Sequence, residues 1–199
     1  MERRIIFVDD EVMSGNPSWG GQIISYATGL GEAKIHVGPT ERYQAEFTSS
    51  LDFGIFRTVD GAVEYFDRLV QDDDEWKEIS GMIIDARMSP GKLKEARNAT
   101  EETAGFVLIM YLHEMMVKNK KSGMKIYLLT NFGDAITTMK EILSQRKIGS
   151  KEPQVAFKPT DKGITLDGSD IEIRFKRKTT TDAPEGVSRF VNDLLVWMK

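Results

Sequence analysis

Five short apolar runs, which mostly lack a strict alternation with polar residues, constrain the fold of this chain more than any other feature. They are IIFV (5–8), FGIF (53–56), GMIID (81–85), KIYLLT (125–130) and QVAF (154–157). Runs of this kind, rich in β-branched and aromatic residues, are typical of strands buried on both faces of a parallel sheet. The sequence therefore predicts a sheet of five parallel strands.

The segments between these runs follow a helical period. Apolar residues recur at helical spacing near 60–70, 133–145 and 184–198, and the segment 103–118 is apolar almost all round. Asp60 is the expected N-cap of the first helix, and Pro184 suits the first turn of the last. Strands that alternate with helices indicate an α/β doubly wound fold, with helices on both faces of one sheet. We expect the 199 residues to form a single domain.

Three stretches are longer than ordinary connections between strands and helices, and they are interpreted as insertions near 12–52, 86–103 and 160–183. The first contains a predicted helix near 22–30. The third is predicted to be a β-hairpin, because Ile164 and Leu166 alternate with polar residues before a DGSD turn and the alternation resumes at Ile171.

Composition excludes several classes of protein. The chain has no cysteine, so disulfides, thiolate zinc sites and thiol nucleophiles are excluded, and its two histidines do not suggest a metal cluster. No apolar run is long enough to span a bilayer and the N-terminus lacks a signal-peptide pattern, so the expected location is cytoplasmic. The net charge of -4 argues against direct nucleic-acid binding, and the basic run RFKRK (174–178) is interpreted as a solvated strand end.

Charged or hydroxyl side chains stand at the ends of four predicted strands. They are Asp9 and Asp10, Asp85, Thr130 and Lys158. The carboxyl ends of the strands in an open α/β sheet form the ligand-binding edge, so these side chains are expected to converge there. Three carboxylates in one cleft need a cation, and Mg²⁺ prefers hard oxygen ligands. A carboxylate, a lysine and a hydroxyl around Mg²⁺ suit phosphoryl transfer to an aspartate.

The same stretches, IIFVDDE, GMIIDARMSP, KIYLLTN and VAFKPTD, resemble the four motifs of the response-regulator receiver domain, the phosphoacceptor module of two-component signalling. The motifs occur in the family's order, and the resemblance covers most of the chain outside the insertions. It implies a flavodoxin-like sheet of five strands in the order 2-1-3-4-5. It also implies a stand-alone phosphoacceptor that switches a partner interface.

The resemblance assigns a role to each residue at the predicted edge. Asp85 would be the phosphorylated aspartate. Asp10 and Asp85 would bind Mg²⁺ directly, Asp9 would act mainly through water, and the backbone carbonyl of Arg87 would be a further metal ligand. Thr130 would bind a phosphoryl oxygen. Lys158 would pair with the phosphoryl group, and the peptide bond to Pro159 would be cis.

The resemblance also implies partners, and the sequence departs from the family at two positions. The implied phosphodonor is a histidine kinase or a histidine phosphotransfer protein, with a downstream protein partner; a homodimer is left open. Asn131 stands where the family usually has a small residue, which predicts slow loss of the phosphoryl group. Val155 replaces a frequent aromatic, so signal transfer through a rotating ring is not expected.

Two alternatives remain at the level of sequence. One is a degenerate receiver that binds a protein partner through its insertions without being phosphorylated. The other is a haloacid-dehalogenase-like phosphohydrolase, which also combines an aspartate nucleophile with Mg²⁺ and lysine. That family has a DxD pattern on its first strand, and the DDEV of this chain lacks the second aspartate.

Overall fold

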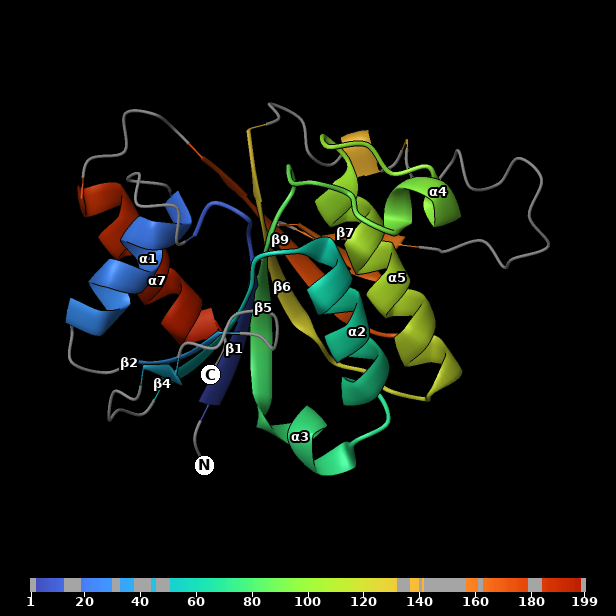
Figure 1. The fold of residues 1–199 in the computed structure, drawn as a ribbon, viewed down its shortest axis with the longest axis horizontal. Helices are drawn as coiled ribbons and strands as arrows, with labels where there is room; N and C mark the ends of the chain where they lie inside the picture. Colours follow the sequence, from blue (N-terminus) through green and yellow to red (C-terminus); the bar gives the residue numbers. More distant parts are fainter. Residues whose placement is uncertain are drawn as a thin grey trace.

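One mixed sheet runs through the molecule in this computed structural model, and helices cover both of its faces (Figure 1). The structure describes residues 3–12, 19–29, 33–37, 44–45, 51–131, 137–139, 141, 157–160, 163–178 and 184–197. The predicted α/β class is therefore confirmed.

The described part of the sheet has nine strands in the spatial order β3-β2-β4-β1-β5-β6-β9-β8-β7. Their bounds are β1 Arg3–Val8, β2 Ala33–Val37, β3 Gln44–Ala45, β4 Leu51–Phe56, β5 Ile79–Asp85, β6 Lys125–Thr130, β7 Phe157–Thr160, β8 Gly163–Leu166 and β9 Ile171–Arg177. The six neighbouring strands from β2 to β9 in this order are parallel. The outer strands β3, β8 and β7 pair antiparallel with their neighbours.

The predicted count of five strands and the predicted order 2-1-3-4-5 are wrong for this sheet. The region expected to be the first insertion contributes β2 and β3, and the predicted hairpin joins the sheet instead of projecting from it. That hairpin is present, with β8 and β9 joined by a turn over 167–170. Its second strand pairs with β6, where the run at 154–157 was expected. Residues 154–156, including Val155, lie outside the described residues.

Helices lie on both faces of the sheet, with α1 and α7 on one face and α2 and α5 on the other (Figure 1). Their bounds are α1 Trp19–Gly29, α2 Val59–Leu69, α3 Asp73–Glu78, α4 Leu93–Arg97, α5 Ala104–Lys118 and α7 Pro184–Trp197. Of the helix predicted over 133–145, only 137–139 and 141 are described, and they are helical. No helix within the described ranges is both long and apolar enough to cross a membrane.

The N-cap of α2 differs from the prediction. The hydroxyl of Thr58, not Asp60, accepts a hydrogen bond from the backbone N–H of Gly61, at 3.1 Å. The carboxylate of Asp60 instead accepts from the backbone N–H of Lys92, at 2.6 Å. Asp60 therefore ties the start of α2 to the loop that follows β5.

Two apolar cores fill the space between the sheet and the helices. Side chains alternate along β1, so that Ile6 and Val8 belong to the core beneath α2 and α5, whereas Ile5 and Phe7 belong to the core beneath α1 and α7. Ile83 of β5 lies in this second core as well. The same alternation, continued by two residues, directs the side chains that end β1 and β5 toward the face of α1 and α7.

Candidate functional site

The candidate site lies where β1 and β5 end, in the middle of the parallel strands. Val8 of β1 is in register with Ile84 of β5, so Asp9 and Asp85 are neighbours at the carboxyl edge. The ladder continues past the strands, because the N–H of Asp9 donates to the carbonyl of Phe56 at 3.1 Å and the N–H of Ala86 donates to that of Leu129 at 2.8 Å. Hydrogen-bonded backbone therefore fixes both carboxylates.

Asp9 is fully buried and only partly satisfied. Its Oδ1 accepts a hydrogen bond from the backbone N–H of Glu11, at 2.8 Å. Its Oδ2 is buried and has no hydrogen-bond partner among the described residues. Burial, reinforced by the charge of Asp85 and opposed by that of Lys178, raises the pKa of Asp9 to about 7. A bound cation would supply the interaction that this carboxylate oxygen lacks.

Asp85 is 2% exposed, and its main partner is Lys178. The Nζ of Lys178 lies 2.6 Å from Oδ2 of Asp85, while the backbone N–H of Arg87 donates to Oδ1 at 3.4 Å. Burial raises the pKa of Asp85, and the charge and hydrogen bond of Lys178 oppose that shift. The strand pairing positions the lysine, because its N–H donates to the carbonyl of Thr130 at 2.8 Å.

Asp10 completes the acidic cluster from the turn after β1. Its side chain is half-buried, and its Oδ2 accepts from the backbone N–H of Ser89 at 3.3 Å. Asp9, Asp10 and Asp85 each offer one oxygen, and these oxygens lie within 4.8 Å of one another. Among the described residues, these three carboxylates are opposed by one lysine contact, that of Lys178 with Asp85. Carboxylate oxygens in this arrangement fit a hard divalent cation such as Mg²⁺.

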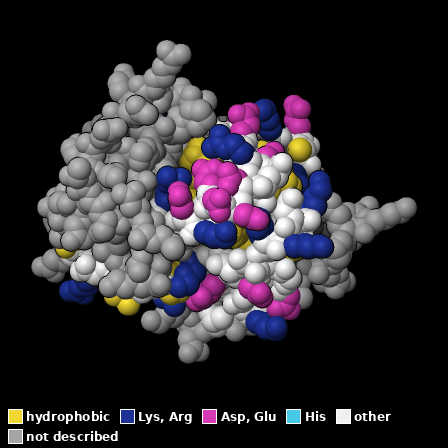
Figure 2. Space-filling model, turned by 90° about the horizontal axis from the view of Figure 1, so that it is seen from below, with side chains coloured by type: hydrophobic (Ala, Val, Ile, Leu, Met, Phe, Trp, Pro, Cys, Tyr) yellow, Lys and Arg dark blue, Asp and Glu magenta, His cyan; other side chains and the backbone are white. Residues whose placement is uncertain are grey.

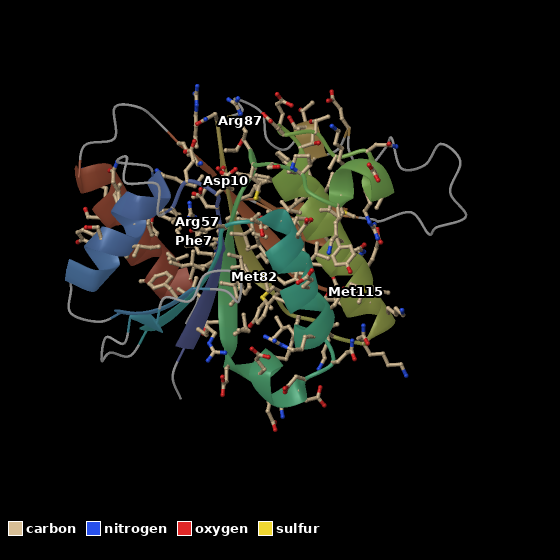
Figure 3. The ribbon with its side chains drawn as sticks, viewed as in Figure 1. Phe7, Asp10, Arg57, Met82, Arg87 and Met115 are labelled. Atoms are coloured by element: carbon tan, nitrogen blue, oxygen red, sulfur yellow. The ribbon has the colours of Figure 1, made fainter. Side chains whose placement is uncertain are left out.

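Thr130 and Arg87 lie at the same edge of the sheet. Thr130 is the last residue of β6 and is buried. Arg87 is exposed, and its side chain lies beyond Asp10 at the upper end of the sheet in Figure 3. The structure therefore brings Asp9, Asp10 and Asp85 together. Thr130 ends the neighbouring strand at the same edge, and the backbone N–H of Arg87 donates to Asp85.

Lys158 does not belong to this group, which corrects the sequence-based prediction. It lies in β7 at the outer edge of the sheet, separated from β6 by β9 and β8. Its side chain is 76% exposed and pairs with Asp167 at 3.1 Å. No described peptide bond is cis, so the expectation for Pro159 is also wrong. The cause is the hairpin, whose second strand takes the position beside β6.

Sequence reasoning missed Lys178, which was included in a run interpreted as a solvated strand end. A signal was present in the alternation of Ile171, Ile173 and Phe175, which marks a half-buried strand, and Lys178 directly follows the last residue of that strand. The order of motifs pointed to the KP dipeptide instead. The strand that pairs with β6 determines which of the two lysines reaches Asp85. This pairing cannot be inferred from the sequence.

A second concentration of acidic side chains lies at the opposite end of the molecule, around α3 (Figure 2). Its members are already matched by basic side chains. The ion pairs join Arg4 to Glu75 and Glu78, Arg68 to Glu75, Lys77 to Asp74, and Lys121 to Asp73. Because these charges are compensated, the described residues at this end form no comparable cation site.

Comparisons with known proteins identify no relative: no family model, no curated protein and no solved structure matches the chain. The geometry of the site is therefore the basis for a proposed function.

Proposed function

We propose that the protein is a phosphoacceptor of the receiver type, which takes a phosphoryl group on Asp85 in the presence of Mg²⁺. The observation that carries the proposal is the contact of 2.6 Å between Lys178 and Asp85 inside a cluster of three carboxylates at the strand ends. A cationic partner and an acidic metal-binding cluster around one aspartate are what phosphoryl transfer to a carboxylate requires.

Each residue of the site would have a separate role in phosphoryl transfer. Asp10 and Asp85, with Asp9 and the carbonyl of Arg87, would hold Mg²⁺, which when bound neutralises charge on the phosphoryl oxygens. An oxygen of Asp85 would attack phosphorus, and the bond from phosphorus to the leaving group would break as the new O–P bond forms. Lys178, in the role expected of Lys158, would pair with a phosphoryl oxygen. The hydroxyl of Thr130 would donate to another.

The phosphodonor and the output belong to the same proposal. A phosphorylated histidine of a kinase or of a phosphotransfer protein is the donor that matches an aspartate acceptor. A cytoplasmic protein partner would then read the phosphorylated state. The loop from Arg87 to Lys92 would respond to phosphorylation of Asp85, because its backbone N–H groups donate hydrogen bonds to the carboxylates of Asp85, Asp10 and Asp60.

The test is the intact mass of the purified chain after incubation with Mg²⁺ and acetyl phosphate. We expect the mass of one phosphoryl group to be added to the wild type and not to Asp85→Asn. Retention of the adduct in Asp85→Asn would overturn the assignment of the acceptor. Absence of an adduct with acetyl phosphate, together with no response to beryllofluoride and Mg²⁺, would overturn the proposed activity.

One observation favours a second candidate, a receiver-like module that binds a partner without being phosphorylated. Asp85 is almost fully buried and its Oδ2 is already in contact with Lys178. A carboxylate closed in this way could serve as a structural ion pair. In the same mass experiment, this candidate predicts that no adduct forms even at high concentrations of phosphodonor.

A further inference from the structure

The first turn of α1 lies against the unsatisfied oxygen of the acidic cluster. A Cβ atom built on Gly20 would lie 2.7 Å from Oδ2 of Asp9, 2.6 Å from Cγ2 of Val12 and 3.1 Å from Cζ of Phe7. Two of these separations are shorter than real Cβ atoms show. Glycine is thus the residue that lets the helix approach this closely.

The neighbours of Gly20 have little room to retreat. Phe7 and Val12 are buried, and both belong to the core that also contains Ile23 of α1. A close-packed core of this kind resists displacement. The carboxylate of Asp9 is held by one hydrogen bond to Oδ1, and Oδ2 has none among the described residues. An added methyl group would therefore move the carboxylate, the helix, or both.

We propose that Gly20 is a positioning residue that sets the orientation of the Asp9 carboxylate within the acidic cluster. The inference rests on the proposed function for its effect on Mg²⁺, but the contact itself is independent of that function. With glycine at 20, the first turn of α1 leaves room for Oδ2 and limits the rotation of the Asp9 carboxylate, which lies beside those of Asp10 and Asp85. The positive end of the helix also favours a carboxylate at this place.

The first measurement is the affinity for Mg²⁺, by calorimetric titration of the purified chain. We expect Gly20→Ala to weaken binding by about 10- to 100-fold, the usual effect of losing a group that orients a ligand. The matched control is Gly54→Ala in β4, where the added Cβ would lie 2.9 Å from Cδ1 of Ile6, away from the cluster. Equal losses of affinity in the two variants would overturn the proposal.

The second measurement needs no metal. In buffer containing EDTA, the loss of melting temperature caused by Gly20→Ala is compared in the wild type and in Asp9→Ala. We expect a clearly smaller loss in Asp9→Ala, because the oxygen that meets the new methyl group is gone. An identical loss in both backgrounds would overturn the inference. If the wild type binds no Mg²⁺ while this coupling is observed, the proposed function fails and the positioning role stands.

If Gly20→Ala does not fold, the variant Val12→Ala/Gly20→Ala removes the other close contact and takes its place in both measurements. Val12→Ala alone is then the reference. The same outcomes support or overturn the proposal, because Oδ2 of Asp9 remains in the path of the new methyl group.

Discussion

The ammonium group of Lys178 supplies positive charge to a cluster that contains three carboxylates. The Lys178 side chain is 13% exposed and contacts a carboxylate that is almost fully buried, so the attraction is little weakened by water. A buried ion pair of this kind contributes little as a unit, but removal of one partner leaves an uncompensated charge. Lys178 therefore matters for Asp85 in a way that an exposed lysine does not.

Replacement of Lys178 by methionine is the first test at the scale of residues. We expect Lys178→Met to slow phosphorylation of Asp85 by about 100-fold or more, because a group that stabilises charge on the transferred phosphoryl is lost. The rate is measured by intact mass over time with acetyl phosphate and Mg²⁺. Lys158→Met is the matched control and should react like the wild type. The reverse pattern would restore Lys158 to the site and contradict the assignment.

The pKa of Asp9 gives a prediction about pH. Its value of about 7 in the folded chain lies above the ordinary value of 3.8, so the native state binds the extra proton between these limits. Without metal, the free energy of unfolding should therefore fall as pH rises from about 4 to about 7. The difference corresponds to at most about 4 kcal/mol. Urea unfolding in EDTA across this range measures it.

Asp9→Asn removes the titrating group with little change of shape. We expect this variant to be more stable than the wild type at pH 8 in EDTA, with a weaker dependence of stability on pH. Asp85, whose pKa is also raised, accounts for the dependence that remains. Asp170→Asn, at an exposed turn, serves as control and should follow the wild type. A wild type whose stability rises steadily over this range would contradict the burial argument.

At the scale of elements, the close approach of α5 to β5 places the backbone around Asp85. Gly105, the second residue of α5, would direct a Cβ to 2.1 Å from the carbonyl oxygen of Asp85, and its N–H donates to the carbonyl of Ala86 at 3.0 Å. The obstacle is backbone and cannot rotate away. The helix would have to withdraw from the strand.

We expect Gly105→Ala to lower the free energy of unfolding by about 1–3 kcal/mol or more, as overpacking does. Gly61→Ala is the matched control in the first turn of α2. There the new Cβ would meet Oγ1 of Thr58 at 3.1 Å, and alanine favours the helix. We expect Gly61→Ala to change the free energy of unfolding only slightly. Urea unfolding of both variants makes the comparison, and equal costs would show that α5 can adjust.

Local pattern was sufficient to predict several elements. The runs at 5–8, 53–56, 81–85 and 125–130 are strands, because buried parallel strands are continuously apolar. The hairpin was also predictable, because alternation on both sides of DGSD is a local signal. Pairing between distant strands was not predictable. No local pattern in the sequence shows that β9, and not the run at 154–157, pairs with β6.

The same division applies to the candidate site. The meeting of Asp9, Asp10 and Asp85 could be predicted, because these residues stand at the carboxyl ends of two apolar runs that form neighbouring parallel strands. Lys158 was assigned from its motif, and the motif lay on a strand that the hairpin displaces to the edge. The contact of Gly20 with Asp9 was beyond prediction, since it depends on the packing of α1 to within tenths of an ångström.

At the scale of the whole molecule, binding of Mg²⁺ to the acidic cluster would change the stability of the native state. A ligand that binds the native state alone adds about 2.7 kcal/mol of stability at 100 times its dissociation constant. We therefore expect saturating Mg²⁺ to raise the melting temperature of the wild type at pH 8. Calorimetric scans with and without Mg²⁺ measure the shift.

The variant Asp10→Ala distinguishes the binding of Mg²⁺ by the acidic cluster from the repulsion among its carboxylates. The variant should lose the response to Mg²⁺ and, in EDTA, should be at least as stable as the wild type, because one of three neighbouring carboxylates has been removed. Unchanged stabilisation by Mg²⁺ would show that the cation binds elsewhere.

The pairing of β9 with both β6 and β8 has a consequence for the order of folding. β8 and β9 are joined by a turn of four residues, whereas β6 and β9 are separated by about 40 residues of chain. Contacts that close short loops form early, because the entropy lost in closing them is smaller. We expect the hairpin to form first and then to dock on β6 as a unit. Lys178 would then reach Asp85 late, so the chemistry of the site would be assembled in one of the last steps of folding.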